Sequence, residues 1–187
     1  RRPDLRKASL ISGRSINLAL SDRGWKALEK AGIAEDIRKI AIPMHKRCMH
    51  ALDGSLSYQP YGVNNEAIYS VSRGGLNQRL MNLADEYPNI SYYFDHRCTD
   101  VNLDSTTLHF HNEKTGNEEV YVSDRVFATD GAFSAVRLSM QKHMIFDYSQ
   151  RYLTHGYKEL VIPANADGTH KLDKNCLHIW PRGEYMM

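Results

Sequence analysis

Three short apolar runs in this chain have the period of a β-strand and lead directly into residues with the period of a helix. They cover residues 14–20, 67–72 and 126–128, and the helix after the last one is expected within 131–143. A chain in which strands alternate with helices predicts an α/β fold. Hairpin patterns lie between these units, so we expect an α/β core that also carries an antiparallel sheet.

The helical patterns have recognisable starts and stops. Ser21 suits the N-cap of the first helix, and Gly32 suits its end. A shorter helix at 36–40 is expected to end before Pro43. The third helix begins near Arg73, and its spacing predicts a buried face. That face consists of Leu76, Leu80 and Leu83.

The antiparallel part is predicted from two hairpins. Residues 44–62 alternate around the turn residues Asp53 and Gly54. A second hairpin is expected within 106–125, with its turn at 115–117. Further strand patterns occur at 91–103, 155–165 and 176–187.

The composition is that of an ordinary soluble domain. Charged residues make up 25% of the 187 residues, and the net charge of +2 is too small to indicate nucleic-acid binding. The three cysteines are widely spaced and form no CxxC pair, so we predict neither a disulfide framework nor a metal site. No acidic cluster or Ser-His-Asp spacing indicates a catalytic side chain. His178 and Trp180 are interpreted as sheet packing, and the role of His155 stays open.

Three local patterns are compatible with ligand binding. Asp130 and Gly131 form a turn before a helix start, which suits a pyrophosphate or a flavin edge, although a plain β-turn-α connection has the same pattern. Arg73, at another strand-to-helix junction, is either a phosphate ligand or a solvated helix-start residue. Arg47 and Tyr61 either converge on one carboxylate or are a surface Arg and a half-buried Tyr.

Taken in order, these weak motifs form a specific series. It runs GRSINLAL, IPM with an Arg three residues after the Met, PYG, SVSR-x-x-LN, TDGAFSAVR, YSQRY, HGYKEL and LHIWPRG. Over nearly the whole chain, the series resembles the kynurenine 3-monooxygenase family of FAD-dependent aromatic hydroxylases. The Asp-Gly motif and the Arg73 region are shared by the wider flavin hydroxylase class. GRSINLALS together with HGYKEL and LHIWP is specific to this family.

The resemblance implies roles for individual residues. Arg47 and Tyr61 match the pair that holds the carboxylate of the amino-acid substrate. Arg73 and Ala19 match positions at the FAD, and Thr99 falls where the family has a backbone contact to its adenosine part. The class motif, which serves both FAD and NADPH, matches Asp130, Gly131 and Arg137. Ala128-Thr129 stands before the Asp-Gly, where the class usually has Gly-Ala.

The implied reaction is the 3-hydroxylation of L-kynurenine, with FAD as cofactor and NADPH and O2 as co-substrates. The implied fold joins a Rossmann-like, glutathione reductase-type FAD domain to an antiparallel-sheet substrate domain. FAD-domain parts would be 1–42 and 66–148, and substrate-domain parts 43–65 and 149–187. Because the family's GxGxxG loop and later Gly-Asp motif are not found here, we expect an internal piece that is inactive alone.

Two rival functions are compatible with the same motifs. One is a flavin hydroxylase of another aromatic acid, and the other is a non-catalytic nucleotide-binding module. The resemblance also implies a location that depends on the source. Bacterial members are cytoplasmic, whereas eukaryotic members sit on the mitochondrial outer membrane through a C-terminal segment not found in this sequence.

The segment GRSINLAL places polar residues inside an apolar run. Side chains alternate across a strand, so one face would carry Ser15, Asn17 and Ala19. The other face would carry Ile16, Leu18 and Leu20. We expect the first face to be turned toward the FAD and the second toward the core. The role of Arg14 stays open between a phosphate and a carboxylate partner.

Overall fold

The computed structural model describes residues 4, 6, 17–143 and 145–187. They divide into two compact units. Unit 1 comprises the described residues of 1–9 together with Ser91–Tyr157, and unit 2 those of 10–90 together with Lys158–Met187. This division differs from the predicted cofactor and substrate parts, which concern binding and stay predictions.

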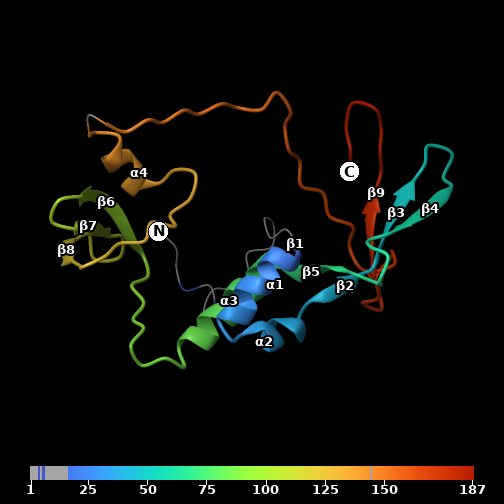
Figure 1. Ribbon diagram of the computed structural model, residues 1–187, viewed down its shortest axis with the longest axis horizontal. Coiled ribbons are helices and arrows are strands. Elements are labelled where there is room, and N and C mark those ends of the chain that lie inside the picture. The colour runs from blue at the N-terminus through green and yellow to red at the C-terminus, as the bar shows by residue number, and fades with distance from the viewer. Residues whose placement is uncertain (1–3, 5, 7–16, 144) are drawn as a thin grey trace. The chain divides into compact units, whose positions relative to one another are not determined.

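The first sheet of unit 2 is antiparallel, in the order β1-β5-β2 (Figure 1). Its strands are β1 (Asn17–Leu20), β2 (Ile42–Met44) and β5 (Ile68–Ser72). The helices of the same unit are α1 (Asp22–Lys30), α2 (Ala34–Arg38) and α3 (Arg73–Ala84). Ser21 and Ser72 are the N-caps of α1 and α3, so two of the three predicted strand-to-helix junctions are confirmed.

The core of unit 2 lies where these helices meet the sheet. Trp25, Ala34 and Ile37 are its most buried members. The partly buried residues packed against them are Leu20, Leu28, Ala41, Tyr69, Leu76 and Leu80. Burial of this apolar surface is what fixes α1 and α2 on the sheet. The predicted apolar face of α3 is confirmed, since Leu83 is buried as well.

The second sheet of unit 2 has the order β4-β3-β9. β3 (Lys46–His50) and β4 (Leu56–Pro60) form the predicted hairpin, and Gly54 in its turn has a φ of 85°. A positive φ favours glycine, which explains the Asp-Gly signal. β9 (Cys176–Ile179) lies parallel to β3, as Figure 1 shows. This places a C-terminal strand beside residues about 130 positions earlier in the chain.

Unit 1 is built on the antiparallel sheet β6-β7-β8. Its strands are β6 (His96–Asn102), β7 (Thr107–Asn112) and β8 (Glu118–Val122). Helix α4 (Ala135–Met140) contacts β6. The hairpin predicted within 106–125 is confirmed, with its strands at β7 and β8. The expected helix within 131–143 is shorter than its pattern, because Ser134 caps it only after the loop has turned.

Two predicted strands are wrong, and one strand was not predicted. Residues 126–128 and 155–165 form no strand. Phe127, Tyr157 and Val161 are largely exposed there, and none of these runs has a pairing partner among the described residues. An apolar run becomes a strand only when a neighbouring strand forms hydrogen bonds with its backbone N–H and C=O groups. β2 is the strand that was not predicted, because three residues (IPM) are too few to show an alternating pattern.

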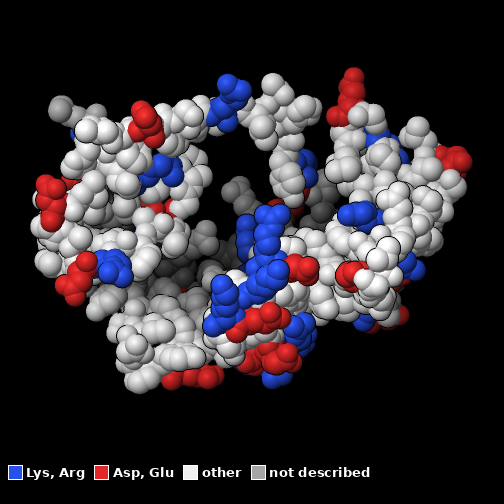
Figure 2. Space-filling model, in the orientation of Figure 1, with Lys and Arg blue, Asp and Glu red and all other residues white. Residues whose placement is uncertain are grey.

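The mixed α/β class is confirmed, while the Rossmann-like parallel sheet stays a prediction. The one parallel pair in the described part of the chain is β3 with β9. No described helix is long and apolar enough to cross a membrane. Acidic and basic side chains are interspersed over α1 and α2 in Figure 2, so that face carries no field of a single sign.

Candidate functional site

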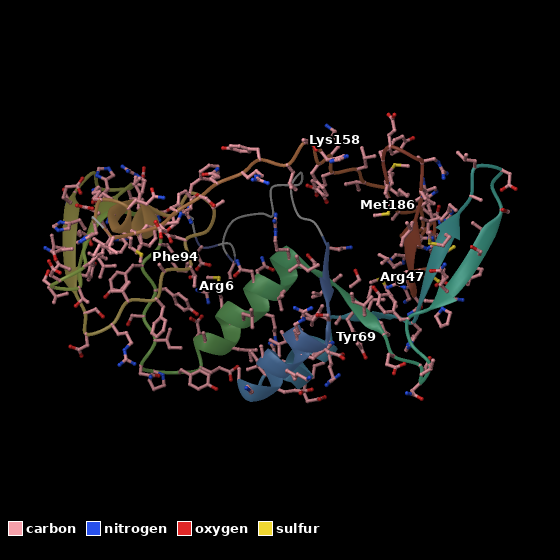
Figure 3. The ribbon with its side chains drawn as sticks, turned by 45° about the horizontal axis from the view of Figure 1, so that its top comes forward. Arg6, Arg47, Tyr69, Phe94, Lys158 and Met186 are labelled. Atoms are coloured by element: carbon pink, nitrogen blue, oxygen red, sulfur yellow. The ribbon has the colours of Figure 1, made fainter. Side chains whose placement is uncertain are left out.

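The structure brings Arg47 and Tyr61 together on the β3-β4 hairpin. Arg47 is half-buried in β3, and Tyr61 follows the last residue of β4. The Arg47 guanidinium lies 4.4 Å from the centre of the Tyr61 ring, a cation–π contact. The Tyr61 N–H donates to the His45 carbonyl at 2.8 Å, which anchors this position. Figure 3 shows Arg47 beside β9 and the hairpin strands.

A second cation–π pair occupies the other face of the same hairpin. The Lys46 ammonium lies 4.5 Å from the centre of the Tyr58 ring. Because alternate residues of a strand point to opposite faces, Lys46 and Arg47 sample different surroundings. Lys46 therefore provides a matched reference for what Arg47 does.

A cavity of about 450 Å³ lies within unit 2, between the two sheets and the segment before β9. One wall is formed by β1, β2 and β5, through Asn17, Leu18, Ala19, Ile42, Met44 and Ser70. Asn17 and Ala19 are exposed while Leu18 and Leu20 are half-buried, so the predicted alternation is confirmed for 17–20. Residues 13–16 of the same motif, with Arg14, Ser15 and Ile16, lie outside the described residues.

The other wall of this cavity was not anticipated from sequence. It consists of Ile162, Pro163, Ala164, Gly168, His170, Lys171, Leu172, Asp173 and Lys174, followed by β9 residues. Asn175 fixes this wall, because its side-chain amide donates to the Pro43 carbonyl at 2.9 Å. The apolar and polar residues of this segment follow neither a helical nor a strand period. The sequence pattern therefore could not show that the segment faces β1.

Arg73 is the first residue of α3, where the strand β5 ends. The Ser72 hydroxyl accepts the Gly75 N–H at 3.3 Å, which caps the helix. Arg73 is an exposed cation at the N-terminus of this twelve-residue helix. Both features favour anions.

In unit 1, Asp130 organises the loop that begins α4. Its carboxylate accepts the Ser134 hydroxyl at 2.6 Å and the Ala135 N–H at 2.8 Å. Partial burial acts to raise the pKa of Asp130, but these hydrogen bonds together hold it below its ordinary value. Gly131 has a φ of 82°, and an added Cβ there would meet no atom within 4 Å. The backbone at Gly131 therefore faces open space.

Arg137 closes the same loop from the helix. It donates to the carbonyls of Gly131 and Ala132 and lies over the Tyr148 ring at 5.1 Å. Thr99 stands at the register shift in β6, and its hydroxyl donates to the His109 carbonyl at 3.1 Å. Burial and then the nearby Asp130 carboxylate raise the pKa of Cys98, so this part of β6 lies close to the Asp-Gly loop.

The chain matches curated proteins along its whole length, and no family model matches it. It is 54% identical over 187 residues to "Kynurenine 3-monooxygenase" of Flavobacterium johnsoniae, covering all of this chain and 41% of that protein. It is 44% identical over 187 residues to the protein of the same name from Anopheles gambiae, of which it covers 38%. The chain thus spans about two fifths of the length of these curated relatives.

Solved structures share the fold at low sequence identity. The flavin-dependent monooxygenase PieE, in complex with FAD and substrate, has a TM-score of 0.62 at 17% identity, over 70% of this chain and 26% of its own. The p-nitrophenol 4-monooxygenase PnpA from Pseudomonas putida has a TM-score of 0.61 at 19% identity, over 71% and 35%. The described chain therefore shares its fold with part of each of these two structures.

Proposed function

Because the chain is related along its whole length to the kynurenine 3-monooxygenase family, we propose that it is part of a flavoprotein that uses NADPH and O2 to hydroxylate L-kynurenine. The observation in this chain that carries the proposal is the contact between Arg47 and Tyr61. It places a fixed cation and a phenol on one face of the β3-β4 hairpin. Together they suit a substrate that has both a carboxylate and an aromatic ring.

Arg47 is the group that would bind the substrate carboxylate. A guanidinium is charged at all physiological pH values and matches a carboxylate with two parallel N–H donors. The Tyr61 ring below it limits the orientations of the guanidinium, and the Tyr61 hydroxyl can donate to the same carboxylate. Substrate orientation is therefore attributed to this pair.

The residues predicted to hold FAD fit such a group. In unit 2, Ala19 presents only a methyl group to the cavity, which leaves room for a flat ring. In unit 1, Gly131 leaves open space above its backbone, which allows a phosphate or a ring edge to approach that loop. Arg73 adds a cation at the start of α3. When bound, the flavin supplies the redox and oxygen-transfer chemistry. Asp130 shapes its loop rather than moving protons, because its carboxylate is already engaged by Ser134 and the α4 backbone.

The test is hydroxylation by the protein at the full length of its relatives. We expect NADPH consumption that depends on L-kynurenine, and a product that carries one oxygen atom from labelled O2. Turnover of a different aromatic acid in place of L-kynurenine would favour a sibling hydroxylase. A protein that neither holds flavin nor consumes NADPH would overturn the proposal in favour of a binding module.

The variant Arg47→Ala tests whether Arg47 binds the substrate carboxylate. Loss of a hydrogen bond to a charged group costs about 1.5–3 kcal/mol, or about 10- to 150-fold in kcat/KM, mainly through a higher KM. Lys46→Ala is the control, because it removes a cation from the same strand on the other face. A KM that is unchanged in Arg47→Ala, or raised equally in both variants, would contradict the assignment.

A further inference from the structure

Strands β3 and β9 bring together three side chains that are typical metal ligands. Cys48 and His50 lie two residues apart on β3, and His178 of β9 is paired with Cys48 in the parallel register. All three therefore project from one face of the sheet, the face opposite to Arg47. The Cys48 sulfur and one nitrogen of each imidazole all lie within 4.8 Å of one another.

From this arrangement we propose that Cys48, His50 and His178 form a binding site for Zn²⁺. Thiolate and imidazole are the ligands that zinc prefers, and three protein ligands leave a fourth position for water. This proposal departs from the sequence-based expectation of no metal site. The sequence contains Cys-x-His twice, at 48–50 and 176–178, but only the pairing of β3 with β9 joins the two segments.

The orientation of His178 is fixed in the way that metal ligands require. Its Nε2 lies 2.9 Å from the Asp173 carbonyl, and since a carbonyl can only accept, Nε2 must carry the proton. The lone pair of Nδ1 is therefore left to face the cluster, where it lies 2.9 Å from His50 Nε2. A backbone carbonyl that accepts the other ring N–H is the usual support of a zinc-bound histidine.

His50 is held as firmly on the other side of the site. Its ring stacks on Trp180, with centroids 4.1 Å apart and an angle of 19° between the planes. Because the lone pair of His178 Nδ1 faces His50 Nε2 at 2.9 Å, the proton of this contact lies on His50 Nε2. For His50 Nε2 to bind an ion, its proton moves to Nδ1 of the same ring, and no proton leaves the residue.

Cys48 supplies the anionic ligand. It is only 1% exposed, so its sulfur lies within the packing of the sheet. Binding would release the thiol proton of Cys48 to solvent. Cys176 is not part of the set, because its thiol donates to the Asp173 carboxylate at 3.2 Å.

Only small movements are needed to admit the ion. In a tetrahedral zinc site the bond lengths of roughly 2.0–2.3 Å place ligand atoms about 3.3–3.7 Å apart. The two imidazole nitrogens must separate by a few tenths of an ångström, and the sulfur must approach them. The rings are half-buried, so both retain a side toward solvent. A bound ion would link two strands that are far apart in sequence.

The experiment titrates Zn²⁺ into the purified, metal-free protein at its full length. Calorimetry should find one Zn²⁺ site. Substituting a residue that only supports a metal ligand typically lowers metal affinity by roughly 10- to 100-fold. The ligand variants Cys48→Ser, His50→Gln and His178→Gln should each lower the Zn²⁺ affinity by more than this. Cys98→Ser, a thiol in unit 1, is the control and should leave the affinity unchanged. Zn²⁺ should also raise the Tm of the wild type, and a chelator should reverse the rise.

A second measurement keeps the test independent of how the variants fold. X-ray absorption at the zinc edge of the wild-type protein should fit one sulfur at roughly 2.3 Å and two imidazole nitrogens at roughly 2.0 Å. A shell without sulfur would overturn the proposal. So would an unchanged affinity in all three ligand variants, which would leave the cluster as a hydrogen-bonded packing of the sheet. Neither result bears on hydroxylation, so the two proposals fail separately.

Discussion

In unit 2 the residues around Trp25 form an apolar core, whereas in unit 1 the β6-β7-β8 sheet is lined by hydrogen-bonded and charged side chains. Trp25 packs edge-on against Tyr69 at 5.0 Å, and Ile37 is completely buried. In unit 1 the Glu119 carboxylate accepts a hydrogen bond from the Tyr121 hydroxyl at 2.7 Å, and the Nε2 atom of His96 lies 3.1 Å from the same carboxylate. The hydrogen bond to Glu119 raises the pKa of Tyr121 to about 12.

This difference teaches which unit should respond to which perturbation. Burial of apolar surface is insensitive to pH and salt, so unit 2 depends on shape and volume. Charged pairs weaken when a partner is titrated or screened, so unit 1 depends on protonation and ionic strength. Among the described residues, unit 1 has one fully buried hydrophobic residue, Val101, whereas unit 2 has eight.

The largest expected effect is that of Trp25→Ala on unit 2. Removing a buried aromatic ring costs about 3–5 kcal/mol of unfolding free energy. Hydrogen exchange read by mass spectrometry should lose protection in peptides from 17–90 and keep it in peptides from 91–143. Equal losses in both sets would contradict the comparison, because they would mean that the units unfold together.

Trp25→Phe is the matched variant for this experiment. Its ring retains most of the apolar volume, and it lacks the indole N–H, which is buried and has no acceptor among the described residues. We therefore expect Trp25→Phe to lower the unfolding free energy much less than Trp25→Ala does. If phenylalanine and alanine are equally destabilising, the indole shape itself or its contact with the Arg38 guanidinium at 4.5 Å carries the effect.

The next effect concerns Ser139, which joins α4 to β6 in unit 1. Ser139 is only 3% exposed; its hydroxyl donates to Asp100 at 2.6 Å and accepts the Val101 N–H at 3.3 Å. Ser139→Ala should cost about 1–3 kcal/mol, because the buried Val101 N–H loses its acceptor. Ser105→Ala, on an exposed turn of the same sheet, should change stability by less than about 0.5 kcal/mol. Urea unfolding followed by hydrogen exchange measures both.

The smallest effect is the acid dependence of the same junction. Hydrogen bonds from Ser139 and then Lys142 lower the pKa of Asp100 to about 2 from an ordinary 3.8. A lowered folded-state pKa means that the ionised form favours folding. This contribution is therefore complete above the ordinary pKa and is lost as the pH falls through about 2. The Asp100 side chain is 52% exposed, so salt should also weaken it.

Asp100→Asn checks this assignment. At neutral pH the variant should be less stable than the wild type in unit 1, and the two should converge below about pH 2. Thermal unfolding at several pH values, with exchange in peptides from 91–143 as the local readout, gives the result. A difference between the two proteins that stays constant over the whole pH range would refute the role of the carboxylate charge.

Several elements could be predicted from sequence because their signals are local. The β3-β4 hairpin was marked by alternation around Asp53-Gly54, and the junction of β5 with α3 by a change of period at Arg73. The Arg47–Tyr61 contact followed from the same hairpin, since its strands fix their relative positions. The roles of these two residues came from resemblance and stay predictions.

Tertiary structure decided what depends on partners distant in the chain. The runs at 126–128 and 155–165 are as apolar as real strands, yet they have no strand to pair with in the described residues. The parallel pairing of β3 with β9 is the converse, because it gives Cys48 and His178 a common face that neither segment encodes alone. Period and turn chemistry act over a few residues and are fixed by the sequence itself. Sheet pairing satisfies backbone groups across more than a hundred residues, so only the folded chain determines which runs pair and which side chains meet.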